Sequence, residues 1–156
     1  MLHILDSRPT VIASHPRPHL SDYLSFYLFC YFGDSKYPGV SVEEGGWRKI
    51  RLAFISDGKA DIHDEEGEPT VILEELQKGN RVILVGVGGG GYDEHTTPDR
   101  SDCEATLVAR DLGLYESGSR GLKELLDYTL AVDRRGEYKR ALDLGRVVEL
   151  LHDVYP

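Results

Sequence analysis

Short apolar runs that end in polar or glycine-rich segments dominate the first half of the chain. Residues 10–14 and 81–87 are continuous and rich in β-branched side chains, which is typical of strands buried on both faces of a parallel sheet. Residues 2–5 form another short apolar run, and residues 48–56 alternate apolar and polar side chains, so both predict strands. Residues 70–76 fit either a strand or a short helix. The pattern predicts a mostly parallel sheet.

Helical spacing of apolar residues marks one segment after the first predicted strand and most of the last third. A helix is predicted from Ser21, as its N-cap, to about Phe32, where Gly33 ends it. Its apolar residues surround most of the helix, so we expect it to be buried on most sides. Further helices are predicted over residues 101–113, where Ser101 and Glu104 have capping-box spacing, over 122–132, with an interruption at 133–136, and over 138–154. The economical fold is one α/β domain over residues 1–156, with a mostly parallel sheet, flanking helices and a helical C-terminal third.

Composition narrows the range of partners. A chain of 156 residues with 40% hydrophobic and 29% charged residues is typical of one globular domain. It carries 27 acidic and 18 basic residues, a net charge of −9. Proteins that grip duplex nucleic acid usually carry a basic surface, so tight duplex binding is not expected. A small phosphorylated substrate or a short oligonucleotide remains compatible with this charge, and a homo-oligomer is left open.

Compartment signals favour the cytoplasm. No stretch approaches the ~20 apolar residues that cross a bilayer, and no basic segment followed by an apolar core indicates a secretory signal. The two cysteines, Cys30 and Cys103, make neither a disulfide framework nor a metal-site spacing. We therefore expect both to be reduced and a cytoplasmic protein without membrane contact.

Metal-capable side chains follow the predicted strand 10–14. His15, His19 and Asp22 lie within eight residues, at a strand end and a helix start. Imidazole and carboxylate groups suit a divalent metal such as Mn²⁺ or Zn²⁺, and open α/β folds place their sites at this edge of the sheet. Arg17 is a candidate contact for a phosphate. Alternatively, Asp22 only supports the helix N-terminus, the histidines are surface residues and Arg17 forms an exposed salt bridge.

A glycine-rich segment follows the predicted strand 81–87. Residues 86–91 formally satisfy G-x-G-x-x-G, but dinucleotide binding needs a helix to open there, and the next convincing helix begins near Ser101. Glycine instead lets the backbone turn sharply and approach a ligand closely. Gly88 and Gly89 are therefore candidates for substrate binding.

A second group of metal-capable residues comes directly after these glycines. Asp93 and His95 are two positions apart, so they face the same side in an extended segment. Glu94 would then face away or orient an imidazole. The alternative is a hairpin tip whose charges are solvated.

Read together, these segments resemble the melanocyte-proliferating-gene family of exonuclease-like proteins, related to the DHH (Asp-His-His) phosphoesterases. The stretch Ser14-His-Pro-Arg-Pro-His-Leu-Ser-Asp22 is similar to the family's T-H-x-G-x-x-H-x-D-[DE], with the second histidine one residue early. The stretch Val85-Gly-Val-Gly-Gly89 resembles V-D-V-G-G, and Tyr92-Asp-Glu-His95 resembles Y-D-H-H. The helix with Ala105-Thr-Leu-Val108 is similar to a family helix that carries A-x-L-V, and the segment 144–156 is similar to the family's helical region.

The resemblance implies a DHH-like fold and a metal-dependent phosphoesterase or nuclease that favours manganese. It places His15, Asp22, Asp93 and His95 at metal-ligand positions. His19 would then neutralise or protonate the leaving oxygen, and Arg17 would bind a phosphate oxygen.

Two departures distinguish this chain from the family pattern. Gly86 stands where the family has a metal-bridging aspartate, and Glu94 replaces the first histidine of the DHH element. Asp57, which follows the predicted strand 48–56, is a candidate replacement carboxylate, and His63 and Asp64 are remoter ones. The competing hypothesis is a non-catalytic relative that binds a metal, a nucleotide or a protein partner as an interaction module.

Overall fold

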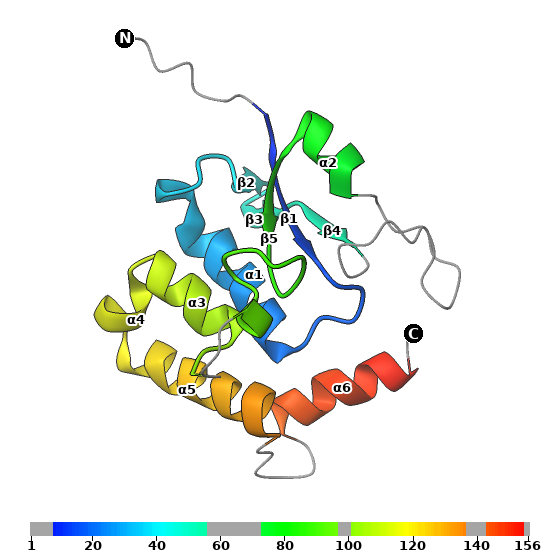
Figure 1. Ribbon diagram of the computed structural model, residues 1–156. Coiled ribbons are helices and arrows are strands. Elements are labelled where there is room, and N and C mark those ends of the chain that lie inside the picture. Colours follow the sequence, from blue (N-terminus) through cyan, green and yellow to red (C-terminus); the bar gives the residue numbers. More distant parts are fainter. Residues whose placement is uncertain (1–7, 56–72, 97–100, 137–142, 155–156) are drawn as a thin grey trace.

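The computed structural model of the protein describes residues 8–55, 73–96, 101–136 and 143–154 (Figure 1). The strand predicted over residues 2–5 and the candidate ligand Asp57 lie outside these ranges, as do His63 and Asp64. No helix within the described ranges combines the length and the apolar character that crossing a membrane requires.

A small parallel sheet forms the centre of the fold. It has three strands in the order β4-β1-β5, namely β1 (Thr10–Ser14), β4 (Leu52–Phe54) and β5 (Arg81–Leu84). Every residue of β1 is buried, which explains its continuous apolar run, because the central strand has neighbours on both edges and helices on both faces. Ala13 lies opposite Ala53 on one side and Leu84 on the other. The prediction of an α/β fold with a parallel sheet is confirmed.

The strand predicted over residues 48–56 is divided between two sheets. Its first part is β3 (Trp47–Ile50), which pairs antiparallel with β2 (Ser41–Glu44), and its second part is β4. The turn between β2 and β3 consists of Gly45 and Gly46, both at positive φ, as a two-residue hairpin requires. The prediction of one strand was wrong because the alternation of side chains continues across the junction while the pairing partner changes.

Helices cover both faces of the parallel sheet (Figure 1). They are α1 (Leu20–Phe32), α2 (Leu73–Gly79), α3 (Glu104–Asp111), α4 (Leu114–Ser117), α5 (Arg120–Arg135) and α6 (Leu144–Val154), with short 3-10 helices η1 (Gly33–Ser35) and η2 (Glu94–Thr96). Ile12 packs into the main core with residues of α1, α3 and α5, whereas Ala13 packs into a smaller core with residues of α2. Helix α2 resolves the ambiguity of residues 70–76 within its described part.

Helix α1 is largely buried, as predicted, but it begins earlier than expected. Its N-cap is His19 rather than Ser21, because the Asp22 carboxylate accepts the backbone N–H of His19 at 2.8 Å. Gly33 follows its last residue, as predicted.

The predicted starts and ends of two later helices are also corrected. Helix α3 is capped by Cys103 instead of Ser101, and Thr106 Oγ1 accepts the Cys103 N–H at 2.9 Å. Helix α5 continues to Arg135 and ends at Gly136, whose left-handed conformation favours glycine. The interruption predicted at residues 133–136 was therefore wrong, and Asp133 belongs to the last turn of α5.

Candidate metal centre

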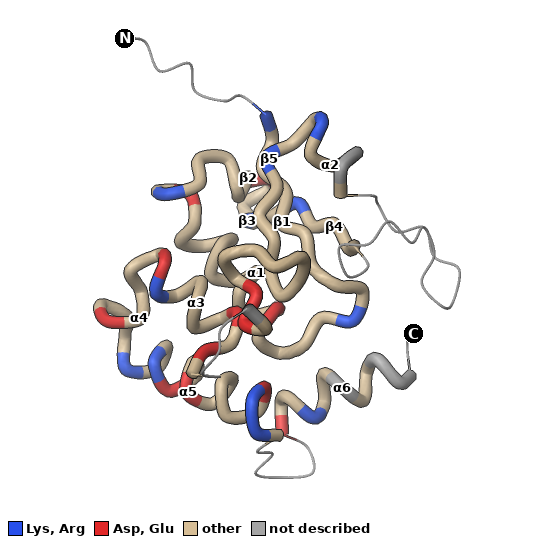
Figure 2. The backbone as a smooth tube through the Cα atoms, viewed as in Figure 1, with Lys and Arg blue, Asp and Glu red and all other residues tan. Residues whose placement is uncertain are grey.

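The loops after β1 and β5 emerge side by side at the carboxyl edge of the sheet. The two strands are parallel neighbours, and the Val85 amide donates to the Ala13 carbonyl at 2.9 Å. Asp and Glu positions gather where the loop after β5 meets α1 and α5 (Figure 2). This edge holds both predicted groups of metal-capable residues.

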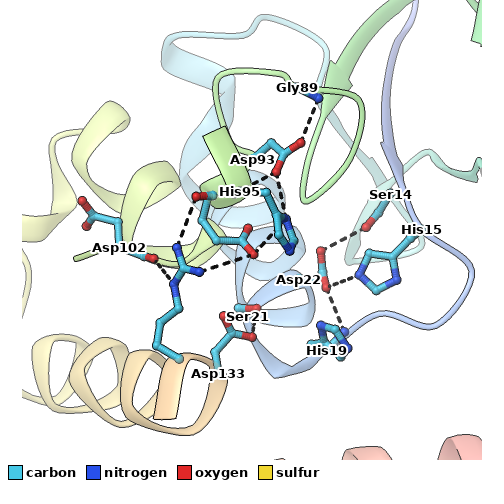
Figure 3. Close-up of polar contacts among 12 residues, drawn as sticks. Ser14, His15, His19, Ser21, Asp22, Gly89, Asp93, His95, Asp102 and Asp133 are labelled. Carbon is cyan, nitrogen blue, oxygen red and sulfur yellow. Dashed lines mark hydrogen bonds and ion pairs between the residues drawn. The ribbon is translucent and has the colours of Figure 1, made fainter. Parts of the chain in front are cut away.

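Asp22 is the centre of the first group. Its side chain is fully buried and accepts hydrogen bonds from Ser14 Oγ at 3.0 Å and from the His19 amide, while His15 Nε2 lies 3.0 Å from Oδ2 (Figure 3). One ligand atom each from His15, His19 and Asp22 lies within 4.8 Å of the others. The structure therefore brings these three predicted residues together. Arg17 lies between the two histidines in sequence and is exposed.

The glycines after β5 fold the chain back on itself. Gly86, Gly88 and Gly89 all have positive φ, which is strained for other residues. The Gly86 amide donates to the Tyr92 carbonyl at 2.9 Å, and the Gly89 amide donates to Asp93 Oδ2 at 2.8 Å. The Gly89 amide thus holds a carboxylate of the protein itself. The G-x-G-x-x-G segment closes a loop instead of opening a helix.

Asp93, Glu94 and His95 form the second group. Asp93 Oδ1 accepts the His95 amide at 3.0 Å and lies 3.0 Å from His95 Nδ1. Glu94 Oε1 lies 3.2 Å from the same nitrogen, so Glu94 helps to orient this imidazole. Glu94 is 4% exposed, whereas the His95 side chain is 75% exposed. The extended segment predicted here was wrong, because η2 begins at Glu94, but Asp93 and His95 still face each other.

Two acidic residues that the sequence did not indicate as ligands, one buried and one partly buried, form a third group. Glu104, at the start of α3, and Asp133, on α5, have ligand atoms within 4.8 Å of each other and of Cys103. Glu104 was interpreted only as half of a capping box, and Asp133 as part of a helix break. The only sequence signal for Glu104 was its position directly before the short run 105–108. An acidic residue at the start of any helix gives the same pattern, so the signal did not indicate a ligand.

Gly86 brings one of these acidic residues close to Asp22. A Cβ atom at Gly86 would lie 2.8 Å from Asp22 Oδ1 and 3.1 Å from Glu104 Oε1. The carboxylates of α1 and α3 therefore approach each other across a point that only a residue without a side chain leaves open. The position is the one where the resembled family has an aspartate.

The interior of the site is strongly acidic. Burial, together with a hydrogen bond to Glu94 and the nearby Asp22 and Asp133 carboxylates, raises the pKa of Glu104 to about 10. Burial and the charge of Glu94 also raise the pKa of Asp133, although a hydrogen bond from Ser21 opposes this. Arg134 lies at the rim, where Nη1 is 3.9 Å from Glu94 Oε1. Excess negative charge is thus concentrated around Glu104.

A polar network anchors the loop that carries the second group. The hydroxyl groups of Tyr37 and Tyr92 donate to Asp111 Oδ2 on α3 at 2.8 and 2.7 Å, and Lys36 Nζ lies 2.5 Å from Asp111 Oδ1. Tyr92 directly precedes Asp93, so this network fixes the position of the backbone at the start of the second group. Burial acts to raise the pKa of Asp111, but the hydrogen bonds from Lys36 and both tyrosines outweigh it and lower the pKa below its usual value.

We expect Asp111→Asn to destabilise the protein by about 1 kcal/mol near neutral pH, and this difference to shrink in acid. Because the folded-state pKa of Asp111 is lowered, its contribution is present above the unfolded-state pKa of about 4 and is lost as pH falls through the folded-state pKa. Urea unfolding of both proteins between pH 7 and pH 2.5 measures this. Asp127→Asn, at an exposed position on α5, serves as the control and should leave the free energy of unfolding nearly unchanged. A constant difference down to the lowest pH would contradict the assignment.

Comparison with known proteins adds no family assignment, because no family model, curated protein or solved structure matches the chain. The candidate centre therefore depends on its own geometry and on the motif resemblance described above.

Proposed function

We propose that the protein is a divalent-metal-dependent phosphoesterase of the DHH type, with a small phosphorylated substrate or a short oligonucleotide as its substrate. The observation that carries this proposal is the convergence of His15, His19 and Asp22 at the carboxyl edge of a parallel sheet. Asp93, Glu94 and His95 follow the neighbouring strand at the same edge. The two groups follow each other along the chain in the same order as the similar motifs of the melanocyte-proliferating-gene family.

The donor atoms fit a manganese-type cation. The first group offers the His15 imidazole and the Asp22 carboxylate as ligands, with the His19 imidazole beside them, and the second offers one imidazole and two carboxylates, a mixture that suits Mn²⁺ or Zn²⁺. Asp22 has no exposed surface, so its charge is held where water cannot screen it. A divalent cation at this centre would polarise a phosphoryl oxygen and lower the pKa of water to supply the nucleophile.

The remaining polar residues have complementary roles in this proposal. His19 is exposed at the rim, where its imidazole can deliver a proton to the leaving oxygen. Arg17, on the same loop, can bind a phosphate oxygen with its guanidinium group. Pro16 and Pro18 flank Arg17 and restrict the loop, which reduces the conformational entropy lost on binding.

Two observations favour a non-catalytic alternative. Asp22 already accepts hydrogen bonds from protein groups, and Gly86 provides no bridging carboxylate of its own. On this alternative, the chain binds a metal, a nucleotide or a protein partner through the same edge without turnover. Metal binding without hydrolysis is its expected signature.

Hydrolysis assays with and without manganese test the proposal. We expect the purified protein to hydrolyse bis-p-nitrophenyl phosphate, or a member of a panel of nucleotides and short oligonucleotides, with Mn²⁺ but not with EDTA. Asp93→Ala should lower kcat/KM by at least about a hundredfold, because several kcal/mol of transition-state stabilisation depend on the centre.

Asp143→Ala provides a control outside the centre, directly before α6, and should retain the wild-type rate. Equal activity in the Asp93→Ala variant and the wild type would remove this residue from the active site. Absence of hydrolysis across the whole panel, despite stoichiometric Mn²⁺ binding, would favour the non-catalytic alternative.

A further inference from the structure

The acidic residue on α3 reaches the space that Gly86 leaves open. Glu104 comes from the first turn of α3, and its Oε1 lies 3.1 Å from the point that a Cβ at Gly86 would occupy. Asp22 Oδ1 lies 2.8 Å from the same point. The helix α3 packs closely against α1, so the position of Glu104 relative to Asp22 is fixed by the main core.

The other oxygen of Glu104 is buried without a partner. Glu104 is 2% exposed, and among the described residues its Oε2 has no hydrogen-bond partner. A buried carboxylate oxygen with no donor is unfavourable, since the group loses its hydration without compensation. The hydrogen bond between Glu104 and Glu94 therefore leaves this second oxygen unsatisfied. A ligand from outside the described part of the chain would satisfy it.

The surroundings select a cation as that ligand. Asp22, Glu94 and Asp133 all act electrostatically on Glu104, and each is an acid. The guanidinium of Arg134 comes only within 3.9 Å of the Glu94 carboxylate, because its Nη2 donates to the Glu94 carbonyl at 3.3 Å and its Nε to the Asp102 carbonyl at 2.6 Å. A divalent cation bound among these carboxylates would satisfy the unpartnered oxygen and offset the repulsion together.

We propose that Glu104 is a direct ligand of the divalent cation and supplies, from α3, the carboxylate that Gly86 lacks. This inference rests on the proposed function, since it concerns the same centre. Glu104 would join the group around Asp22 to the group around Asp93 and Glu94. On this inference, Gly86 does not abolish the metal centre. Its lack of a side chain leaves the room that Glu104 needs to bind the cation.

Binding of Mn²⁺ alone tests the inference without relying on turnover. We expect titration of free Mn²⁺, followed by electron paramagnetic resonance, to give a Kd at least about tenfold weaker for Glu104→Gln than for the wild type, because loss even of groups that only support ligands costs that much. Glu104→Asp keeps the charge but is one methylene shorter, so its affinity should be intermediate. Glu116→Gln, at an exposed position on α4, should bind as the wild type does.

Folding of the variants and the position of the cation complete the test. Glu104→Gln is nearly isosteric, and circular dichroism with thermal unfolding shows whether it folds. If it does not, a wild-type crystal soaked in MnCl₂ decides, with the cation expected roughly 2.0–2.6 Å from a Glu104 oxygen. Unchanged Kd in a folded Glu104→Gln variant, a cation away from Glu104, or no Mn²⁺ binding by the wild type would each overturn the inference.

The outcome is separable from that of the proposed function. Mn²⁺ binding that depends on Glu104, without hydrolysis of any phosphoester, would leave Glu104 as a ligand and remove the enzyme. Mn²⁺-dependent hydrolysis, combined with a Kd for Mn²⁺ that Glu104→Gln does not change, would support the proposed enzyme and exclude Glu104 as a ligand.

Discussion

Replacing Asp22 by asparagine is expected to lower kcat/KM by at least about a hundredfold and to weaken Mn²⁺ binding at least about tenfold. Asp22 is the one fully buried carboxylate of the first group, and its two oxygens are shared among Ser14, His15 and the His19 amide. Asparagine removes the charge that a cation needs. It also offers a single acceptor oxygen, so its NH₂ group must face a position where the wild type has an acceptor.

The same substitution should reduce the free energy of unfolding by about 1–3 kcal/mol, the usual loss when a charged hydrogen-bond acceptor is removed from a buried site. Urea unfolding without metal measures this part. If Asp22 had only a structural role, the variant would keep its activity as long as it remained folded. We therefore expect a loss of kcat/KM larger than the unfolded fraction of the variant explains.

Asp34→Asn is the matched control for this prediction. Asp34 is an exposed residue of η1 that accepts the Gly39 amide at 3.0 Å, so the change removes a charge from a comparable bond to the backbone. We expect its activity and Mn²⁺ affinity to equal those of the wild type. Undiminished Mn²⁺ affinity in Asp22→Asn would show that this carboxylate only caps α1 and orients His15.

Replacing Gly86 by alanine is expected to reduce the free energy of unfolding by about 2–5 kcal/mol. The residue has a φ of +68°, and left-handed backbone disfavours a Cβ by about 1–2 kcal/mol. The new methyl group would also lie 2.8 Å from Asp22 Oδ1 and 3.1 Å from Glu104 Oε1. Both carboxylates are buried in close-packed surroundings, so relieving the clash should add about 1–3 kcal/mol.

Gly113→Ala separates the two contributions. Gly113 has nearly the same φ, +70°, but nothing lies within 4 Å of the position of its Cβ. It should therefore lose only the backbone part, about 1–2 kcal/mol. Urea unfolding of both variants gives the comparison, and equal losses would mean that the approach of Asp22 and Glu104 to Gly86 is looser than the structure indicates. Gly86→Ala should also weaken Mn²⁺ binding, whereas Gly113→Ala should not.

Features encoded by neighbouring residues were predicted correctly. The apolar run of β1 identified a buried strand, and the glycine-rich segment after β5 identified a sharp turn. His15, His19 and Asp22 lie within one strand end and one helix turn, so their proximity follows from local geometry alone. For the same reason the sequence indicated Asp93 and His95 as a pair.

Features that depend on distant segments could be read only from the tertiary structure. The alternating residues 48–56 do not reveal where the pairing partner changes, so the division between β3 and β4 was missed. The cap of α3 was predicted at Ser101, whereas the structure has Cys103 in that position, with its N–H bonded to Thr106.

The sequence by itself therefore determined the α/β class, the buried strand over residues 10–14 and the two local groups of metal-capable side chains. Only the tertiary structure placed Glu104 and Asp133 together in a third group, and showed that Asp22 and Glu104 approach each other at Gly86. The physical reason is that strand and turn preferences act between near neighbours, whereas the approach of α3 to α1 is set by the shared hydrophobic core.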